Sequence, residues 1–211
     1  MSSPSHSLTF YHSPHSTSSV TAAILAELNQ PHPSLPTITV KQITLSLETH
    51  DTHAPDYLAN VNPNGRVPAI VHDGTTIWES AAITMYLGET FGVDRGLYPP
   101  LGPQRGEAMK WVVWTNVTLT TPTRALMAAL RKGEKEGEGK AREEIMGALG
   151  VLESGLKGRE WLLGEGGYSL ADTHVWCFVH WMGMMGVGLE EVKGVKGWAE
   201  RVGKREALKG L

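Results

Sequence analysis

The sequence has a single cysteine, little excess of either charge and no long apolar run, and each absence excludes a class of protein. Cys177 alone cannot form an internal disulfide, and no CxxC or Cys/His cluster has the spacing of a zinc site. The 19 basic and 22 acidic residues give a formal net charge of −3, too little to attract nucleic acid or anionic lipid. No segment approaches the roughly 18 apolar residues of a membrane span. We therefore expect neither nucleic acid nor a membrane as a partner.

The start of the chain also lacks the features of a secretory signal. Residues 1–7 are polar and rich in serine, with neither a basic start nor an apolar stretch, and are expected to form a polar tail. Together with the lone cysteine, this predicts a reducing compartment and a cytoplasmic protein.

The first half of the chain contains an alternation of strand and helix patterns. Residues 8–11 predict a strand, and after a loop rich in Ser, Pro and His the apolar positions Val20, Ile24 and Leu28 recur at helical spacing. A β-branched stretch over residues 37–41 then predicts a second strand. The chain is thus expected to open β-α-β.

A hairpin and a helix follow after a connecting segment. Residues 66–71 and 76–78 predict two strands joined at Asp73-Gly74, the commonest hairpin signal. A helix is expected over about residues 80–91. The prolines within 93–103 stop any helix, so this segment is predicted to be a linker between an N-terminal domain, 8–92, and a second domain, 104–211.

Helical periods replace the strand pattern from residue 104 onward. One amphipathic helix should run until Pro122, which is expected to kink or end it. A second is predicted around Ile145, Leu149 and Leu152. Between them, residues 131–144 are dense in glycine and in charges that cancel locally, which favours a solvated loop or a frayed helix end.

Two motifs in the first half suggest a binding site. In the segment Asn62-Pro63-Asn64-Gly65-Arg66-Val67-Pro68, the proline at the strand start fits either an edge strand or a cis bond. Glu79 and Ser80 stand where the last strand gives way to a helix, whose N-terminal amides favour an anion while a Glu accepts from an ammonium. The pair could hold the charged end of an amino acid, although Ser80 could equally be a simple cap.

The order of elements together with these two motifs resembles the cytosolic glutathione transferases over nearly the whole chain. The resemblance implies an α+β thioredoxin-like N-terminal domain, β-α-β-α-β-β-α, followed by an all-α C-terminal domain. It implies that Pro68 follows a cis bond and that the backbone of Val67 pairs with the cysteinyl part of glutathione. Glu79 and Ser80 match the pair that holds the γ-glutamyl end.

Other residues are assigned to the site by the same resemblance. Arg66 stands beside Val67 in the matching motif. His53 falls where relatives place a polar residue near the glycine carboxylate, and a solvated loop histidine is the alternative. Tyr11, Trp114 and Thr118 are candidates to line a pocket for a small electrophilic co-substrate.

The residue that activates the glutathione thiol is predicted to be Ser16. It lies in the loop just before the first helix, where its hydroxyl and the helix N-terminus can both stabilise an anion. Residues 14–17 also resemble the stretch that bears the catalytic serine of serine-type transferases. Nearby hydroxyls leave the register open, and four residues are rivals for the same role: Tyr11, Ser13, Thr17 and Ser18.

Two further patterns are interpreted as structural. Ser169 and Asp172 form an S-x-x-D capping box before a helix rich in Trp, in which Cys177 and His180 are expected to be core residues. The histidines invite a metal hypothesis, but no two form a helix-borne pair with a carboxylate at zinc-enzyme spacing. We therefore predict no metal.

The function predicted from the sequence is that of a glutathione transferase, with glutathione as co-substrate and a small electrophile as its partner. Two alternatives remain. One is glutathione-dependent cis-trans isomerisation of a conjugated double bond, since the serine-rich loop resembles members that isomerise. The other is a non-catalytic binding module with the same fold. The resemblance also implies a homodimer.

Overall fold

The structure of the protein is a computed structural model in which residues 6–210 are described. The predicted polar tail, 1–7, lies mostly outside this range, and Ser7 begins the first strand. The chain divides into two compact units after Tyr98, and each is described by itself. This division falls inside the predicted linker, 93–103.

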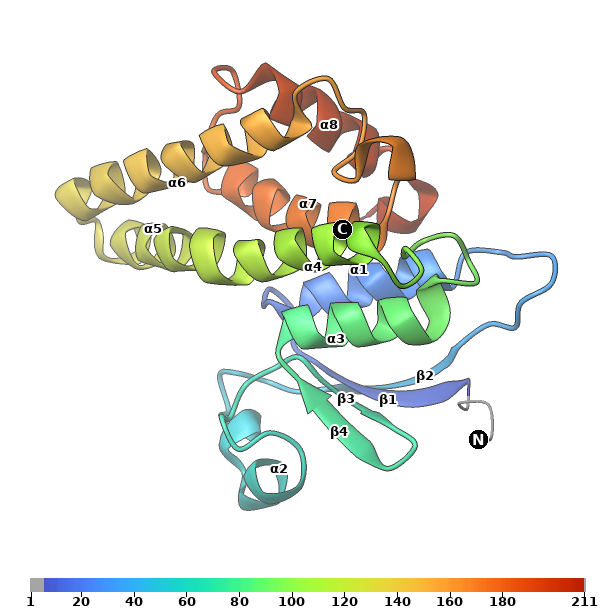
Figure 1. The fold of residues 1–211 in the computed structure, drawn as a ribbon. Helices are drawn as coiled ribbons and strands as arrows, with labels where there is room; N and C mark the ends of the chain where they lie inside the picture. The colour runs from blue at the N-terminus through green and yellow to red at the C-terminus, as the bar shows by residue number, and fades with distance from the viewer. Residues whose placement is uncertain (1–5, 211) are drawn as a thin grey trace. The chain divides into compact units, whose positions relative to one another are not determined.

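The first unit is a four-stranded mixed sheet with helices (Figure 1). Its elements are β1 (Ser7–His12), α1 (Ser18–Leu28), β2 (Thr39–Thr44), η1 (Asp51–His53), α2 (Pro55–Asn60), β3 (Ala69–His72), β4 (Thr75–Trp78), α3 (Ser80–Leu87) and η2 (Gly88–Gly92). The strand order is β2-β1-β3-β4, with β1 parallel to β2 and antiparallel to β3. The predicted order β-α-β-α-β-β-α is confirmed.

Helices α1 and α3 lie side by side on one face of the sheet, and α2 lies away from that face (Figure 1). The apolar positions of α1, including Val20, Ile24 and Leu28, are almost completely buried. Phe10 and Ile70, which pair across β1 and β3, complete this core. The apolar face of α1 and the inward-facing apolar side chains of β1 and β3 therefore belong to one core between the helices and the sheet.

Several boundaries in this unit differ from the sequence prediction. The second strand is β2, Thr39–Thr44, rather than 37–41, because it pairs in register with β1 from Ser7↔Thr39 to His12↔Thr44. The third strand begins at Ala69 rather than 66. The last helix ends as an α-helix at Leu87 and continues as one π turn through Gly92.

The first part of the predicted linker is packed into the first unit. The Arg95 guanidinium donates hydrogen bonds to the carbonyl oxygens of Leu28, Pro36 and Phe91, at 2.8, 2.6 and 2.9 Å. Tyr98 is buried against Gly88, where a Cβ atom would lie 2.6 Å from the ring. Only a glycine at position 88 lets the tyrosine approach this closely.

The second unit is helical throughout the described residues up to 210. Its elements are α4 (Pro103–Trp114), η3 (Thr115–Leu119), α5 (Thr120–Lys132), α6 (Lys135–Leu156), η4 (Gly164–Gly166), α7 (Leu170–Met184), α8 (Lys193–Gly203) and η5 (Glu206–Leu208). Helices α5 and α6 pack together, and α7 lies against α4 and α8 (Figure 1). The predicted all-helical second half is confirmed.

Pro122 does not end its helix, contrary to one of the two predicted outcomes. Helix α4 passes through the π turn η3 into α5 without a break, and Pro122 is the third residue of α5. A proline ring conflicts with the carbonyl four residues earlier, here that of Thr118 in the π turn. The wider turn changes the hydrogen-bond pattern where the conflict falls, so the helix continues.

The charged stretch 131–144 is also not a loop. Gly133, with φ +70°, ends α5, and α6 begins at Lys135. Glu138 pairs with Lys135 and Arg142, each at 3.1 Å, one turn away on either side. Because charges at this spacing face each other on a helix, the stretch forms a solvated helix rather than a loop.

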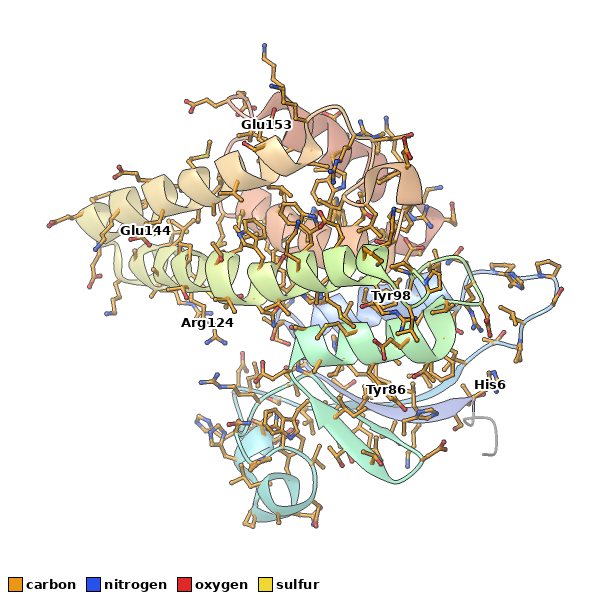
Figure 2. All side chains as sticks on the ribbon, viewed as in Figure 1. His6, Tyr86, Tyr98, Arg124, Glu144 and Glu153 are labelled. Carbon is orange, nitrogen blue, oxygen red and sulfur yellow. The ribbon has the colours of Figure 1, made fainter. Side chains whose placement is uncertain are left out.

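Long-range caps hold the helical unit together. Glu153 lies on α6 (Figure 2). Its carboxylate accepts hydrogen bonds from the amides of Gly194 and Val195 at the start of α8, at 2.9 and 2.7 Å. A carboxylate there satisfies two otherwise unpaired donors and complements the positive end of the helix.

No helix among residues 6–210 is long and apolar enough to cross a membrane.

Candidate active site

The register of the sheet places several predicted site residues at one end of the first unit. Tyr11 near the end of β1 pairs with Ala69 at the start of β3, and Ala69 pairs with Trp78 at the end of β4. The loop after β1, the turn before β3 and the start of α3 therefore adjoin the same end of the sheet. Residues far apart in the sequence meet there because adjacent antiparallel strands run in opposite directions.

The turn before β3 contains a cis peptide bond between Val67 and Pro68, as the family resemblance implied. The carbonyl of the preceding residue, Arg66, accepts hydrogen bonds from the Tyr57 hydroxyl and the Asn62 amide, both at 2.8 Å. Burial, followed by the charge of Tyr11, raises the pKa of Tyr57 to about 12, so its hydroxyl keeps the proton that it donates. The hydrogen bonds from Tyr57 in α2 and from Asn62 just after it therefore hold the turn in place.

The backbone of Val67 is joined to the loop after β1. The Thr17 hydroxyl donates to the Val67 carbonyl at 3.2 Å. The Val67 amide has no hydrogen-bond acceptor among residues 6–210. An N–H group left in this way beside a helix start can pair with the backbone carbonyl of an extended peptide.

The loop after β1 ends in a cluster of hydroxyl groups at the start of α1. Ser16 is half-buried, and its Oγ lies 2.7 Å from the Ser13 carbonyl and 2.7 Å from Ser18 Oγ. Thr17 occupies the N-cap position, but its side chain does not cap the helix. The Ser18 amide instead donates to Ser16 Oγ at 3.2 Å, so the half-buried Ser16 hydroxyl lies at the helix N-terminus, a position that favours negative charge.

The start of α3 has an unusual backbone. Glu79 is the N-cap residue with φ +72° and ψ +119°, a conformation that L-residues rarely adopt. Its exposed carboxylate makes no hydrogen bond or ion pair within residues 6–210. Ser80 follows as the first helical residue and is buried. The strained turn directs an acidic side chain to solvent next to a helix N-terminus.

Two polar side chains border the turn before β3. The ring of exposed His53 lies over Gly65, where a Cβ atom would come within 3.0 Å of Nε2. Gly65 also has φ +62°, so glycine is required there for both reasons. Arg66 is exposed, and its guanidinium is unpaired among the described residues 6–210. A carboxylate could be bound by these cationic and polar groups.

Known proteins match this chain over both units. It fits the description "Glutathione S-transferase, N-terminal domain" over residues 18–90 and "Glutathione S-transferase, C-terminal domain" over residues 109–206. The glutathione S-transferase-like protein tpcF of Aspergillus fumigatus is 30% identical over 210 residues, which cover 89% of this chain and 86% of that protein.

The chain belongs to the glutathione transferase family. It is also 27% identical to glutathione S-transferase GstB of Escherichia coli over 176 residues, 80% of this chain and 83% of that one. Among solved structures, the glutathione transferase URE2P6 of Phanerochaete chrysosporium, in complex with oxidized glutathione, superposes with a TM-score of 0.83 at 24% identity. It covers 95% of this chain and 92% of its own. That likeness shows the fold, with its thioredoxin-like first domain.

Within this family member, the first unit brings together Ser16, Val67, Pro68, Glu79 and Ser80 at the strand ends, with His53 and Arg66 at the border. Tyr11 is at the same end, half-buried and edge-on to Tyr57 with ring centroids 5.6 Å apart.

The remaining predicted pocket residues, Trp114 and Thr118, lie in the second unit, where they remain predictions. Trp114 is half-buried at the end of α4, edge-on to Trp111 at 5.3 Å, and Thr118 is exposed in η3. Within residues 6–210 no three His, Cys, Asp or Glu side chains gather as a metal ion would require.

Sequence reasoning did not find three contributors to this geometry. The bond from Thr17 to Val67 spans fifty residues and carries no local signal. His12, whose Nδ1 lies 2.8 Å from Ser18 Oγ, is an ordinary strand-end residue in the sequence. Tyr57 sits in a short helix that no pattern marked, although its neighbour Asn62 belongs to the motif that was recognised.

The structural motifs of the second unit agree with the sequence interpretation. Ser169 and Asp172 form a complete capping box at the start of α7. Cys177 is buried, and burial raises its pKa to about 12, so it remains a neutral thiol. His180, which was expected in the core, is only half-buried and stacks on Trp176 with ring centroids 4.8 Å apart.

Proposed function

We propose that the protein is a glutathione transferase in which Ser16 holds the glutathione thiol as a thiolate for attack on a small electrophile. The observation that carries the proposal is the half-buried Ser16 hydroxyl at the start of α1, where it accepts from the Ser18 amide, beside the turn that contains the Val67 amide. A hydroxyl donor and a helix N-terminus together favour an anionic sulfur.

Each part of glutathione has a complementary group at this end of the sheet. The Val67 amide has no acceptor within residues 6–210, so it can donate to the backbone carbonyl of the cysteinyl residue. The Glu79 carboxylate complements the γ-glutamyl ammonium, and the start of α3 at Ser80 complements its carboxylate. Arg66 and His53 are placed to bind the glycine carboxylate.

Burial and hydrogen bonding narrow the choice among the rival hydroxyls. Ser18 is completely buried, which leaves it no surface for a ligand. The Thr17 hydroxyl is bonded to the Val67 carbonyl at 3.2 Å, whereas Ser16 Oγ lies at the start of α1 and accepts from the Ser18 amide. Tyr11, half-buried at the same strand end, and Ser13, which is 3% exposed, remain rivals.

The chemistry required of this site is modest. A free thiol has a pKa of about 8.5, and a helix N-terminus or nearby donors lower it to roughly 3.5–7.5. The thiolate then forms a carbon–sulfur bond while a leaving group departs, or adds to a conjugated double bond whose carbon later takes a proton from water. The thiol proton is released to solvent when the complex forms.

The proposal is tested by the ultraviolet absorbance of the thiolate of bound glutathione, measured against pH. The wild type should titrate below pH 7.5, and Ser16→Ala should titrate near the free value of about 8.5. Tyr11→Phe is the matched control and should keep the wild-type midpoint. A Ser16→Ala midpoint equal to that of the wild type would exclude Ser16, and a shift in Tyr11→Phe would assign its role to Tyr11.

Product analysis separates conjugation from glutathione-dependent isomerisation, the second candidate favoured by the serine-rich loop. Conjugation consumes glutathione in proportion to product, whereas isomerisation returns it unchanged. A folded protein that is not retained on immobilised glutathione would instead indicate a binding module without this activity.

The proposed enzyme is a homodimer. Val113 and Val117, one turn apart along α4 and η3, are 44% and 68% exposed, and Met127 and Leu130 of α5 are 39% and 40% exposed. Exposed apolar side chains at helical spacing are typical of a surface that a second copy covers. Light scattering at micromolar concentration should give twice 22.9 kDa, and the mass of one chain would refute the dimer.

A further inference from the structure

A closed hydrogen-bond cluster surrounds Ser18 behind the proposed thiol site. Its hydroxyl oxygen lies 2.8 Å from His12 Nδ1, 2.9 Å from the Ser13 carbonyl oxygen and 2.7 Å from Ser16 Oγ. The same oxygen accepts a hydrogen bond from the Ser13 amide at 3.0 Å. Ser18 is completely buried, so all its partners are within the protein.

The cluster has fewer hydroxyl protons than acceptors. Ser16 and Ser18 each carry one hydroxyl proton, and each oxygen already accepts from a backbone amide, that of Ser18 and that of Ser13. The Ser13 carbonyl can take a proton from either hydroxyl, at 2.7 and 2.9 Å. A bare His12 Nδ1 would be a second acceptor and a thiolate a third. Two protons cannot serve three acceptors.

The position of the proton on His12 decides which of the three acceptors receives no hydroxyl proton. If Nδ1 is bare, it takes the Ser18 proton, and the buried Ser13 carbonyl can be satisfied only by Ser16. If Nδ1 carries a proton, it donates to Ser18 Oγ, and Ser18 donates to the Ser13 carbonyl. Only the second arrangement leaves the Ser16 proton free for a sulfur atom.

We propose that His12, acting through Ser18, is a positioning residue that frees the Ser16 hydroxyl to donate to the glutathione thiolate. The inference rests on the proposed role of Ser16. It requires the neutral imidazole with its proton on Nδ1, or the imidazolium. Burial lowers the pKa of His12, which favours the neutral ring, and His12 makes no ion pair within residues 6–210 that would charge it.

Ser18→Ala tests this arrangement without touching the ligand, because Ser18 is completely buried. Removing its hydroxyl leaves Ser16 as the only donor to the Ser13 carbonyl, so the thiol pKa of bound glutathione should rise by about one unit or more toward the Ser16→Ala value. Ser18→Thr restores the hydroxyl and should restore the midpoint. A Ser18→Ala midpoint equal to the wild type would overturn the proposal.

A second measurement uses the unaltered protein. Nitrogen NMR of histidine-labelled protein reports which ring nitrogen of His12 carries the proton. The glutathione complex should show a protonated Nδ1 at the pH where the thiolate is formed, and a bare Nδ1 would overturn the proposal even if both Ser18 variants fail to fold.

The variants distinguish failure of the proposed role of Ser16 from failure of the proposed role of His12. If Ser16→Ala leaves the thiol pKa unchanged, the proposed activator is wrong and the role of His12 falls with it. If Ser16→Ala raises the thiol pKa while folded Ser18→Ala does not, Ser16 remains the activator and only the contribution of His12 and Ser18 is wrong.

Discussion

The starts of helices α7 and α3 use similar residues but differ in what they leave unsatisfied. At α7, Asp172 is completely buried and its carboxylate accepts from the amides of Leu162 and Ser169 and from Trp198 Nε1, each at 2.9 Å. At α3, the Glu79 side chain caps nothing, and its carboxylate has no partner within residues 6–210.

This difference separates a folding device from a binding site. A cap whose donors and acceptors are all paired inside the protein fixes the helix and offers nothing to a ligand. A helix start with strained backbone and unpaired charge costs stability, and such a cost persists where a function uses it.

The largest expected effect is a loss of stability when the fully paired cap of α7, called here the saturated cap, loses Asp172. Asp172→Ala removes the acceptor of three buried N–H groups, and each buried donor left unpaired costs about 1–3 kcal/mol, so the second unit should lose about 3–9 kcal/mol. Urea unfolding followed by tryptophan fluorescence measures this loss. Ser169→Ala, which removes only the hydroxyl of the same cap, should cost about 1 kcal/mol. Equal losses in the two variants would show that the carboxylate is not the centre of the cap.

The second prediction concerns His174, which is also in α7 and completely buried at 2.8 Å from Asn116 Oδ1. Burial lowers its pKa to about 3 from 6.5, so below pH 6.5 the unfolded chain binds one more proton than the folded one. Stability then falls with pH by about 1.4 kcal/mol per unit, or about 2.7 kcal/mol by pH 4.5.

His174→Gln removes this titration and keeps an amide near the position of Nε2. The free energy of unfolding, measured from pH 7 to 4.5, should fall less steeply in the variant than in the wild type by that amount. Parallel pH profiles would show that His174 is not neutral in the folded protein.

The saturated cap could be predicted from the sequence, whereas the binding site could be located only in part. Ser169 and Asp172 are three residues apart, and that spacing alone defines a capping box. The proposed site depends on the pairing of Tyr11 with Ala69 and of Ala69 with Trp78. Strand register depends on contacts between distant segments, so only the resemblance to a known family brought these residues together in advance.

Local competition between signals explains the errors along the chain. Glycines at 137 and 139 and dense charge favoured a loop at 131–144, yet the pairs of Glu138 with Lys135 and Arg142 have helical spacing and could have been recognised. At the start of α7, Thr173 stands where an apolar residue often packs against the residue before the cap. It shares a hydrogen bond of 2.6 Å with Tyr168, a polar substitute that spacing does not reveal.

At the start of α3, the charged groups are unpaired within residues 6–210 and a ligand can bind them. Ser80→Ala should weaken glutathione binding by about 1.5–3 kcal/mol, because the hydroxyl would donate to the charged γ-glutamyl carboxylate. Calorimetry should therefore show the Kd rising by roughly 10- to 150-fold, with a smaller change in the turnover of the bound complex. Ser169→Ala is the matched control at the saturated cap and should leave the Kd unchanged. An unchanged Kd in Ser80→Ala would make Ser80 a structural residue only.

The smallest expected effect has opposite signs for stability and for binding. Glu79 holds φ +72° and ψ +119°, a strain of about 1–3 kcal/mol that glycine does not experience. The greater freedom of glycine in the unfolded chain opposes this gain and costs about 0.4–1 kcal/mol of stability. The net effect of Glu79→Gly should therefore be a stabilisation of about 1 kcal/mol. The same change removes the carboxylate proposed for the γ-glutamyl ammonium and should raise the glutathione Kd. Glu79→Ala loses the carboxylate but keeps the strain, so it should weaken binding without the gain in stability. If thermal unfolding shows Glu79→Gly to be less stable than Glu79→Ala, the turn is not strained, and the distinction between the two helix starts would rest on unpaired charge alone.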